Sequence, residues 1–233
     1  MRWSRPGRRP FVGIVAGLAA FVATAVLALT RNGGADSGSL SLAALSTLGR
    51  LRPSAAAGPP GPEGVPIPEA RALAGTRLLT TGEQIDHIAC QAGEQVYLHI
   101  HAHLTIFVRG VPRQVPAGIG IAPPYEVART PRGAFVAGAP CFMSLHTHSA
   151  DGIIHTESPS KRIYTLGEFF DIWGQPLSRR QLGPAHGPVT VLFNGRVFTG
   201  NPRRLPLLAH AQIQLEVGGP LVAPEKIVFP AGL

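Results

Sequence analysis

The stretch that decides the fold is VYLHIHAHLTIFVRG, residues 96–110, in which apolar and polar side chains alternate strictly. Alternation with a period of two is typical of a β-strand whose two faces meet different surroundings. One face carries Leu98, Ile100, Ala102, Leu104, Ile106 and Val108, and the other carries His99, His101 and His103. Arg109-Gly110 then favours a turn into a second strand. We therefore predict a strand with an apolar core face and a histidine face.

A second hairpin is predicted from CFMSLHTHSADGIIHTE, residues 141–157. The polar residues 149–152 favour a loop between two short apolar runs. That loop would place His146 opposite His155 and His148 two residues along on the same face.

The last third of the chain predicts one helix and two more β-segments. Thr165 and Glu168 have the spacing of a capping box at the start of the helix. The apolar side chains that follow at helical spacing are Leu166, Phe169, Phe170 and Trp173. VTVLFNGRVFTG, residues 189–200, favours a hairpin with an Asn-Gly turn, and AQIQLEV, residues 211–217, a closing strand. The predicted fold is α+β: mainly antiparallel β, with hairpins packed as a sheet or sandwich, and one main amphipathic helix at about 165–174.

The N-terminus has the pattern of a membrane anchor. Residues 11–30 contain no charged side chain and would span about 30 Å as a helix, the thickness of a bilayer core. The basic residues before them are Arg2, Arg5, Arg8 and Arg9. Basic residues favour the cytoplasmic side, so we expect residues 1–10 to be a cytoplasmic tail and the C-terminal domain of a single-pass cell-membrane protein to lie outside. Secretion after signal cleavage is the alternative.

Composition changes again after the apolar segment. Residues 31–75 are rich in Gly, Ser and Pro and are predicted to be a linker that does not order itself. Residues 76–233 would form the extracytoplasmic β-rich domain, with 76–160 and 161–233 as possible sub-halves.

The net charge of +8 does not indicate a nucleic-acid binder. Residues 1–52 hold seven of the 21 basic residues and one of the 13 acidic residues, which leaves a nearly neutral domain. The basic excess is therefore a sign of membrane topology, and we expect no nucleic-acid partner. Nothing in the pattern identifies a protein partner.

Cys90 and Cys141 are the two cysteines of the chain. In an exported domain an even number of cysteines favours a disulfide, here one that closes a loop of about fifty residues. A thiolate metal ligand beside the histidines is the competing interpretation.

The clustered histidines predict a metal site. Neutral imidazole is a common ligand of zinc and copper, and residues at i and i+2 of a strand point the same way, about 7 Å apart. The candidate ligands are His99, His101, His103, His146, His148 and His155. His99 and His103 would be about 13 Å apart, too far to share one ion. We expect His101 and His103 to join His146 or His148, with His155 completing the set.

The function these patterns favour is a membrane-anchored, extracytoplasmic protein that binds Zn or Cu through its histidines. One alternative is a metal-dependent hydrolase or lyase with an open three-histidine zinc site, in which Glu157 is the candidate ligand or acid/base group. The other is a cell-surface interaction module without metal.

Several blocks together resemble an uncharacterised family of exported bacterial and archaeal proteins. They are TGEQIDHIAC, HIHAHLTIFVRG, VPAGIGI, SLHTHSADGIIHTESP, YTLGEFFDIWG, VLFNGRVFTG, LLAHAQIQLEVG and FPAGL, within residues 80–233. The resemblance implies export but carries no activity. The family motif reads LHTHD where this chain has Ser149 after His148, so Asp151 would have to replace that carboxylate if it is functional.

Overall fold

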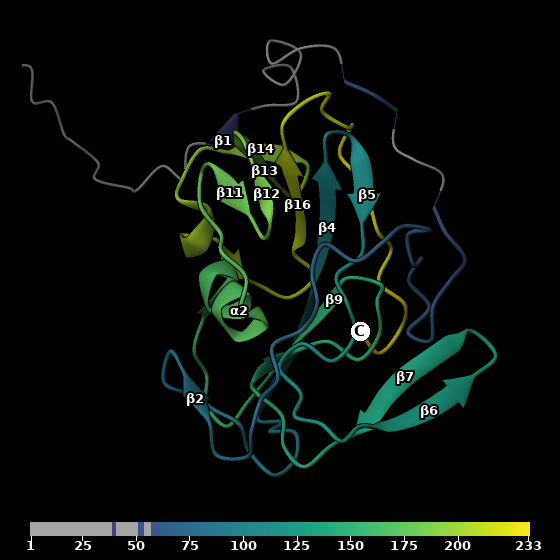
Figure 1. The fold of residues 1–233 in the computed structure, drawn as a ribbon, viewed down its shortest axis with the longest axis vertical. Helices are drawn as coiled ribbons and strands as arrows, with labels where there is room; N and C mark the ends of the chain where they lie inside the picture. Colours follow the sequence, from purple (N-terminus) through teal and green to yellow (C-terminus); the bar gives the residue numbers. More distant parts are fainter. Residues whose placement is uncertain (1–38, 41–50, 54–56) are drawn as a thin grey trace, which may run out of the picture. The chain divides into compact units, whose positions relative to one another are not determined.

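The computed structural model describes residues 39–40, 51–53 and 57–233, and its largest element is an eight-stranded sheet (Figure 1). The strands lie in the order β1 (Ser39–Leu40), β14 (Arg196–Phe198), β13 (Val189–Phe193), β16 (Gln212–Val217), β4 (Leu98–Val108), β9 (Ile153–Ser158) and β8 (Leu145–His146), with β5 (Val111–Arg113) also paired to β4. β16 runs parallel to β4, and the other neighbouring pairs of this sheet are antiparallel. The predicted α+β class, mainly antiparallel β, is confirmed.

The remaining elements are short. Two-stranded sheets pair β2 (Gln84–Ile85) with β3 (Ile88–Ala89), β6 (Glu126–Thr130) with β7 (Gly133–Gly138), β10 (Tyr164–Thr165) with β15 (Pro206–Leu207), and β11 (Gln181–Leu182) with β12 (Ala185–His186). One α-helix, α2 (Leu166–Trp173), and a 3₁₀ turn, η2 (Pro202–Arg204), complete the described elements. The β6–β7 hairpin stands apart from the main sheet at the lower right of Figure 1.

Helix α2 belongs to the hydrophobic core on the apolar side of the sheet, as predicted. Thr165 caps it, and the reciprocal bond from Glu168 completes the capping box. Its apolar side chains are buried together with those of the strand β4: Leu166, Phe169, Phe170, Ile172 and Trp173 from the helix, and Ala102, Leu104 and Ile106 from the strand.

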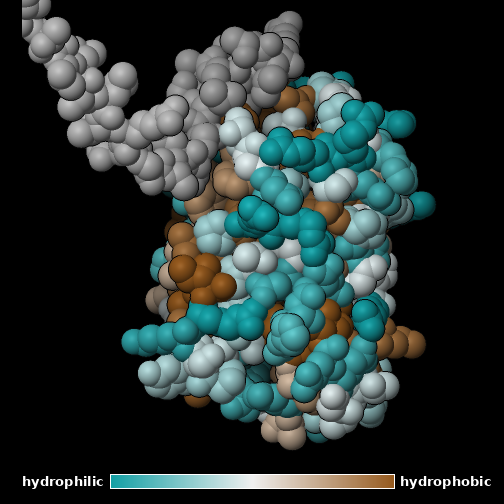
Figure 2. Space-filling model, turned by 90° about the vertical axis from the view of Figure 1, so that its left-hand side faces the viewer, coloured by the Kyte–Doolittle hydropathy of each residue, from teal (hydrophilic) through white to brown (hydrophobic). Residues whose placement is uncertain are grey.

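On the side of the molecule shown in Figure 2, which is the left side of Figure 1, the apolar side chains form small, separate groups among hydrophilic ones.

The predicted turns are also confirmed. Asn194 and Gly195 have φ of 50° and 76°, and both values are positive, as a type I′ hairpin turn requires. Gly152 has φ of 87°, and a Cβ there would lie 2.4 Å from the carbonyl oxygen of Leu104. The glycine therefore lets the predicted hairpin loop pass close to β4. His146 pairs with His155 in the expected register.

Most of the histidine face of β4 is buried as well, which the alternation did not predict, and only His99 at its start is exposed. His101, His103, Thr105 and Phe107 are each at most 8% exposed. The C-terminal segment passes the same region: Gln214 Oε1 accepts from the Glu225 backbone N–H at 2.8 Å, and Gln212 Oε1 from that of Ile227 at 2.9 Å. The polar side chains of β16 thus accept hydrogen bonds from backbone N–H groups of the C-terminal segment. Because these polar groups have partners, a polar strand face can be buried here.

The predicted boundary of the linker is wrong at its C-terminal end, because residues 57–75 pack on the domain. Val65 is fully buried, and the Leu73 N–H bonds the carbonyl of Gln114 at 3.0 Å. Prolines lower the entropy of the unfolded chain, so few apolar contacts suffice to order such a segment. Composition alone therefore gave the wrong expectation for this part.

The predicted cytoplasmic tail (1–10) and membrane anchor (11–30) lie outside the described residues. Among the residues that are described, no helix combines the length and apolar character needed to cross a bilayer. The described residues fall in one compact unit, Asp36–Leu233. Strands from 76–160 and from 161–233 share the eight-stranded sheet.

Candidate metal centre

Strand pairing places three histidines in one row across the sheet. His101 of β4 pairs with His155 of β9, and His155 pairs with His146 of β8. Paired residues on neighbouring strands point to the same face, about 5 Å apart. The three imidazoles therefore lie side by side, on the face opposite α2.

Three more polar side chains flank this row. His99 and Glu157 pair with each other two residues from His101 and His155, and His148 follows His146 beyond the end of β8. The resulting donors form two overlapping groups, each within 4.8 Å: His146, His148, His155 and Glu157, and His99, His101 and His155. Each of these groups could hold a metal ion.

The distances between ring nitrogens are those expected around a cation. His146 Nε2 and His148 Nε2 are 3.1 Å apart, and His101 Nε2 and His155 Nδ1 are 3.2 Å apart. Ligands of a tetrahedral zinc ion with bonds of about 2.0–2.1 Å lie about 3.3 Å from one another. The imidazoles are thus nearly at ligand spacing.

In three of the imidazoles, one ring nitrogen donates a hydrogen bond to an acceptor outside the row of histidines. His146 Nδ1 donates to the carbonyl of Met143 at 2.9 Å, and His148 Nδ1 to that of Val136 at 2.5 Å. His155 Nε2 donates to Glu63 Oε1 at 2.7 Å. A hydrogen bond of this kind fixes ring tautomer and orientation in metal-binding histidines. In all three rings the remaining nitrogen faces the cluster.

Burial and mutual charge keep most of these imidazoles neutral. Burial, with the neighbouring His155 charge, lowers the pKa of His101 to about 4 and that of His146 well below its usual value. Burial also lowers the pKa of His148. For His155 burial works in the same direction, but hydrogen bonds and charge from Glu157 and Glu63 outweigh it and raise its pKa to about 9. Without metal at neutral pH, His155 is therefore protonated beside the neutral His101, His146 and His148.

Glu157 is the carboxylate at the centre of the cluster. Its side chain is 3% exposed, and Oε1 lies 3.1 Å from His99 Nε2. The second oxygen, Oε2, is buried and has no hydrogen-bond partner among the described residues. A buried carboxylate oxygen without a partner is costly unless a cation occupies its free side.

Ser149 connects the cluster to a second carboxylate. Its hydroxyl oxygen lies 2.5 Å from both Glu63 Oε2 and Asp151 Oδ2. One hydroxyl proton serves only one of these contacts, so the other requires a protonated carboxyl group. Burial, followed by the charge of Glu63, raises the pKa of Asp151 to about 7, which makes Asp151 the group that carries the proton.

His103 does not join the cluster, so the expected pairing with His101 is not what the structure has. Its Nε2 donates to the Asp151 carbonyl at 2.8 Å, and Thr105 donates its hydroxyl to Nδ1 at 3.3 Å. Both ring nitrogens are therefore occupied. The partner of His101 is His99, whose Nε2 is 3.1 Å away.

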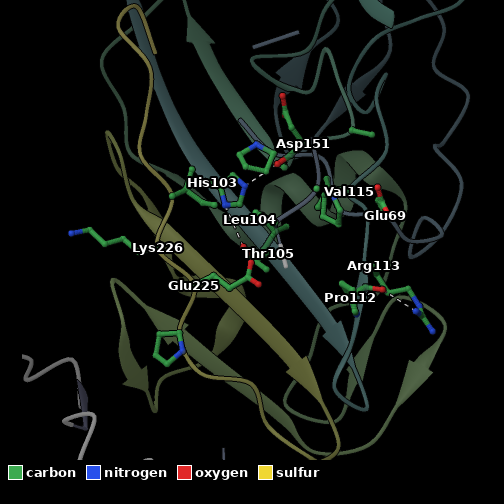
Figure 3. A pocket seen from close by; sticks show the side chains of 18 residues that line it. Glu69, His103, Leu104, Thr105, Pro112, Arg113, Val115, Asp151, Glu225 and Lys226 are labelled. Carbon is green, nitrogen blue, oxygen red and sulfur yellow. Dashed lines mark hydrogen bonds between the residues drawn. The ribbon is translucent and has the colours of Figure 1, made fainter. Parts of the chain in front are cut away.

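His103 instead lines a cavity of about 270 Å³ on the same face of the sheet (Figure 3). Leu104, Thr105, Val115 and Asp151 lie around it, and the C-terminal segment with Lys226 borders it. None of the six cluster donors lines this cavity.

Sequence reasoning missed two carboxylates of the site. Glu63 lies in the Pro-rich segment that was predicted to be a linker, and no local pattern distinguishes it. Glu94 Oε1 lies 3.4 Å from His148 Nε2. Its position four residues after Cys90 was the available signal, because a disulfide from Cys90 brings this stretch to the hairpin that carries His148.

The Cys90–Cys141 disulfide is present, with the two Cα atoms 5.3 Å apart. The Gln91 N–H bonds the Phe142 carbonyl at 2.9 Å beside it, so the two segments run together toward the cluster. Since both cysteines are used, the thiolate-ligand alternative is wrong. The cluster offers only nitrogen and oxygen donors. In comparisons with known proteins, no family model, no curated protein and no solved structure matches this chain.

Proposed function

We propose that this chain is an extracytoplasmic metal-binding protein whose histidine and glutamate cluster holds a divalent transition-metal ion. The observation that carries the proposal is the orientation of His146, His148 and His155. Each has one ring nitrogen bonded to a fixed acceptor and the other directed into the cluster. Imidazoles that only fill a polar core do not need this shared arrangement.

The donor set supports Zn²⁺ or Cu²⁺. Imidazole nitrogen with one or two carboxylates is typical of both ions, whereas Ca²⁺ and Mg²⁺ prefer sites made of oxygen. Soft thiolate ligands that would favour Cu⁺ are excluded, because the two cysteines form a disulfide.

The proposed location is outside the cell, attached by the apolar segment 11–30 with residues 1–10 in the cytoplasm. The charge pattern of the N-terminus supports this orientation. The disulfide supports it too, since such bonds persist in oxidising compartments. Accessibility of the domain to protease added outside intact cells would test it, and a soluble secreted form starting between residues 25 and 40 would contradict it.

The two alternatives fit the geometry less well. A metalloenzyme needs a substrate space at its metal ligands, but the 270 Å³ cavity is not lined by the cluster donors. An interaction module without metal would leave its histidines on the surface, whereas His101, His146, His148 and His155 are at most 6% exposed.

Elemental analysis of the full-length protein, purified in detergent without a histidine tag, tests the proposal. We expect at least one equivalent of zinc or copper, with a lower metal content in His155→Ala and an unchanged one in His186→Ala, whose histidine is exposed and outside the cluster. No bound transition metal at micromolar concentrations would contradict the proposal.

A further inference from the structure

The cluster has more donors than one tetrahedral ion uses. Five imidazoles and one carboxylate make up the two groups, which share His155 but do not merge into a single group within 4.8 Å. Zinc in proteins almost always takes four ligands. The number of donors and their division into two groups therefore suggest two positions.

The first position is a closed ring of four donor atoms. His99 Nε2 is 3.1 Å from His101 Nε2, and His101 Nε2 is 3.2 Å from His155 Nδ1. Glu157 Oε1 closes the ring, 3.4 Å from His155 Nδ1 and 3.1 Å from His99 Nε2. The Nε2 atom of His155 is bonded to Glu63, which leaves Nδ1 as its donor atom, and Nδ1 lies 3.2 Å from His101 Nε2.

The second position lies at the end of β8. His146 Nε2 and His148 Nε2 are 3.1 Å apart, and their Nδ1 atoms are bonded to backbone carbonyls. Glu94 Oε1 lies 3.4 Å from His148 Nε2 and supplies a third donor. Glu157 Oε1 lies 4.0 Å from His146 Nε2, so the same carboxylate borders both positions.

Glu157 is placed to connect the two positions. One of its oxygens faces the first ring, and the other is buried without a hydrogen-bond partner in the described part of the chain. A carboxylate that contributes one oxygen to each of two ions holds them about 3.5–4 Å apart, the spacing of two-metal sites. A bridging role would give a ligand to the buried Oε2, which has no hydrogen-bond partner among the described residues.

The charges around the cluster also favour more than one cation. Glu63, Glu94 and Glu157 each contact a cluster histidine. The ion pairs of the described residues give none of these three carboxylates a lysine or arginine partner. The side chains of Glu63 and Glu157 are buried, and buried carboxylates are normally paired or bound to metal. Divalent ions would replace the proton of His155 as the compensating positive charge and would add to it.

We propose that the cluster binds two divalent metal ions bridged by the Glu157 carboxylate. His99, His101 and His155 hold the first ion, and His146, His148 and Glu94 hold the second. This inference rests on the proposed metal-binding function and goes beyond it in the number and arrangement of the ions.

Zinc titration of the full-length protein tests the inference. The protein is stripped with a chelator, titrated with Zn²⁺ and analysed for bound zinc after equilibrium dialysis. We expect two equivalents. One equivalent would overturn the inference and leave the proposed function intact, whereas none would overturn both.

Matched variants assign the positions. His101→Ala and His146→Ala should each retain one equivalent of zinc, and His186→Ala should retain two. Loss of all zinc in both cluster variants would show a single shared centre and overturn the inference.

Copper titration uses the unmodified protein. It therefore tests whether two bridged ions bind even if a variant fails to fold. The first equivalent of Cu²⁺ should give the electron paramagnetic resonance spectrum of an isolated ion. The second should reduce the signal per copper, because a carboxylate bridge couples the two spins. Two equivalents with additive, uncoupled signals would overturn the bridge.

Discussion

His101 and His103 stand two residues apart on the same face of β4, yet the structure uses them differently. Both are buried, and burial lowers the pKa of each to about 4. His103 has partners at both ring nitrogens, Asp151 and Thr105. Among the described residues, the hydrogen-bond contacts of His101 Nε2 are to two other histidines, at 3.1 Å and 3.2 Å. The difference shows that neither burial nor pKa makes an imidazole a ligand. What matters is a ring nitrogen whose near neighbours are the nitrogens of other imidazoles.

The largest difference in metal affinity should appear when each of these two histidines is replaced by alanine. His101→Ala should weaken metal binding by at least about a hundredfold. Loss of a residue that only hydrogen-bonds to a metal ligand already lowers metal affinity by about 10–100-fold, and loss of a ligand should cost more. His103→Ala should leave metal affinity within about threefold and lower thermal stability, since it empties a buried site. Competition with a fluorescent zinc chelator measures both affinities. Equal losses in the two variants would contradict the distinction.

Metal affinity should rise with pH by about tenfold per unit between pH 7 and 9. In this range a metal ion must displace the proton of His155, whose pKa is raised to about 9 by Glu157 and Glu63 against the effect of burial. His101 has its pKa near 4 and contributes no such dependence here. Calorimetry in buffers with different ionisation enthalpies should detect about one proton released per cluster at pH 7.5. Affinity that levels off just above pH 6.5, the ordinary histidine value, would contradict this assignment.

Glu63→Gln should test how the hydrogen bond to Nε2 of His155 affects metal binding. The amide oxygen can still accept from His155 Nε2, but its charge is lost, so metal affinity at pH 9 should fall by about tenfold. The dependence of affinity on pH should also become weaker, because Glu63 is one cause of the raised pKa of His155. Glu69→Gln, in the same segment but not a partner of His155, is the control. A Glu63 variant with unchanged affinity and pH dependence would refute this role.

The metal-free protein should respond to pH in the opposite direction. A folded pKa of about 9 for His155 lies above the ordinary value of about 6.5, so its proton stabilises the folded state below pH 6.5. That stabilisation is lost as the pH rises from 6.5 to 9. Thermal unfolding of the stripped protein should therefore shift to lower temperature over this interval, and the shift should shrink in Glu63→Gln.

The smallest effect on metal binding should come from Thr105→Val. The change leaves Nδ1 of the buried His103 without its donor, which should lower the free energy of unfolding by about 1–3 kcal/mol. Metal affinity should stay within about twofold, because His103 is not a donor of the cluster. Chemical denaturation together with the chelator assay checks both parts. A large loss of affinity would connect His103 to the site after all.

The sequence predicted well where a feature depends on local pattern. Alternation predicted β4 and its apolar face, Thr165 and Glu168 predicted the start of α2, and the Ser149–Gly152 loop predicted that His146 pairs with His155. Features that depend on distant segments were not predictable in this way. The cover over the histidine face comes from residues 57–75 and from the C-terminal segment, and Glu63 carries no pattern of its own. The difference between His101 and His103 depends on Asp151, nearly fifty residues away.

X-ray absorption at the zinc edge tests the central claim most directly, because it reports the donor atoms themselves. For the zinc-loaded full-length protein we expect nitrogen and oxygen ligands at about 2.0–2.1 Å, with the outer-shell scattering of several imidazole rings and no sulfur. A sulfur ligand at about 2.3 Å, or an oxygen shell without imidazole scattering, would contradict the account.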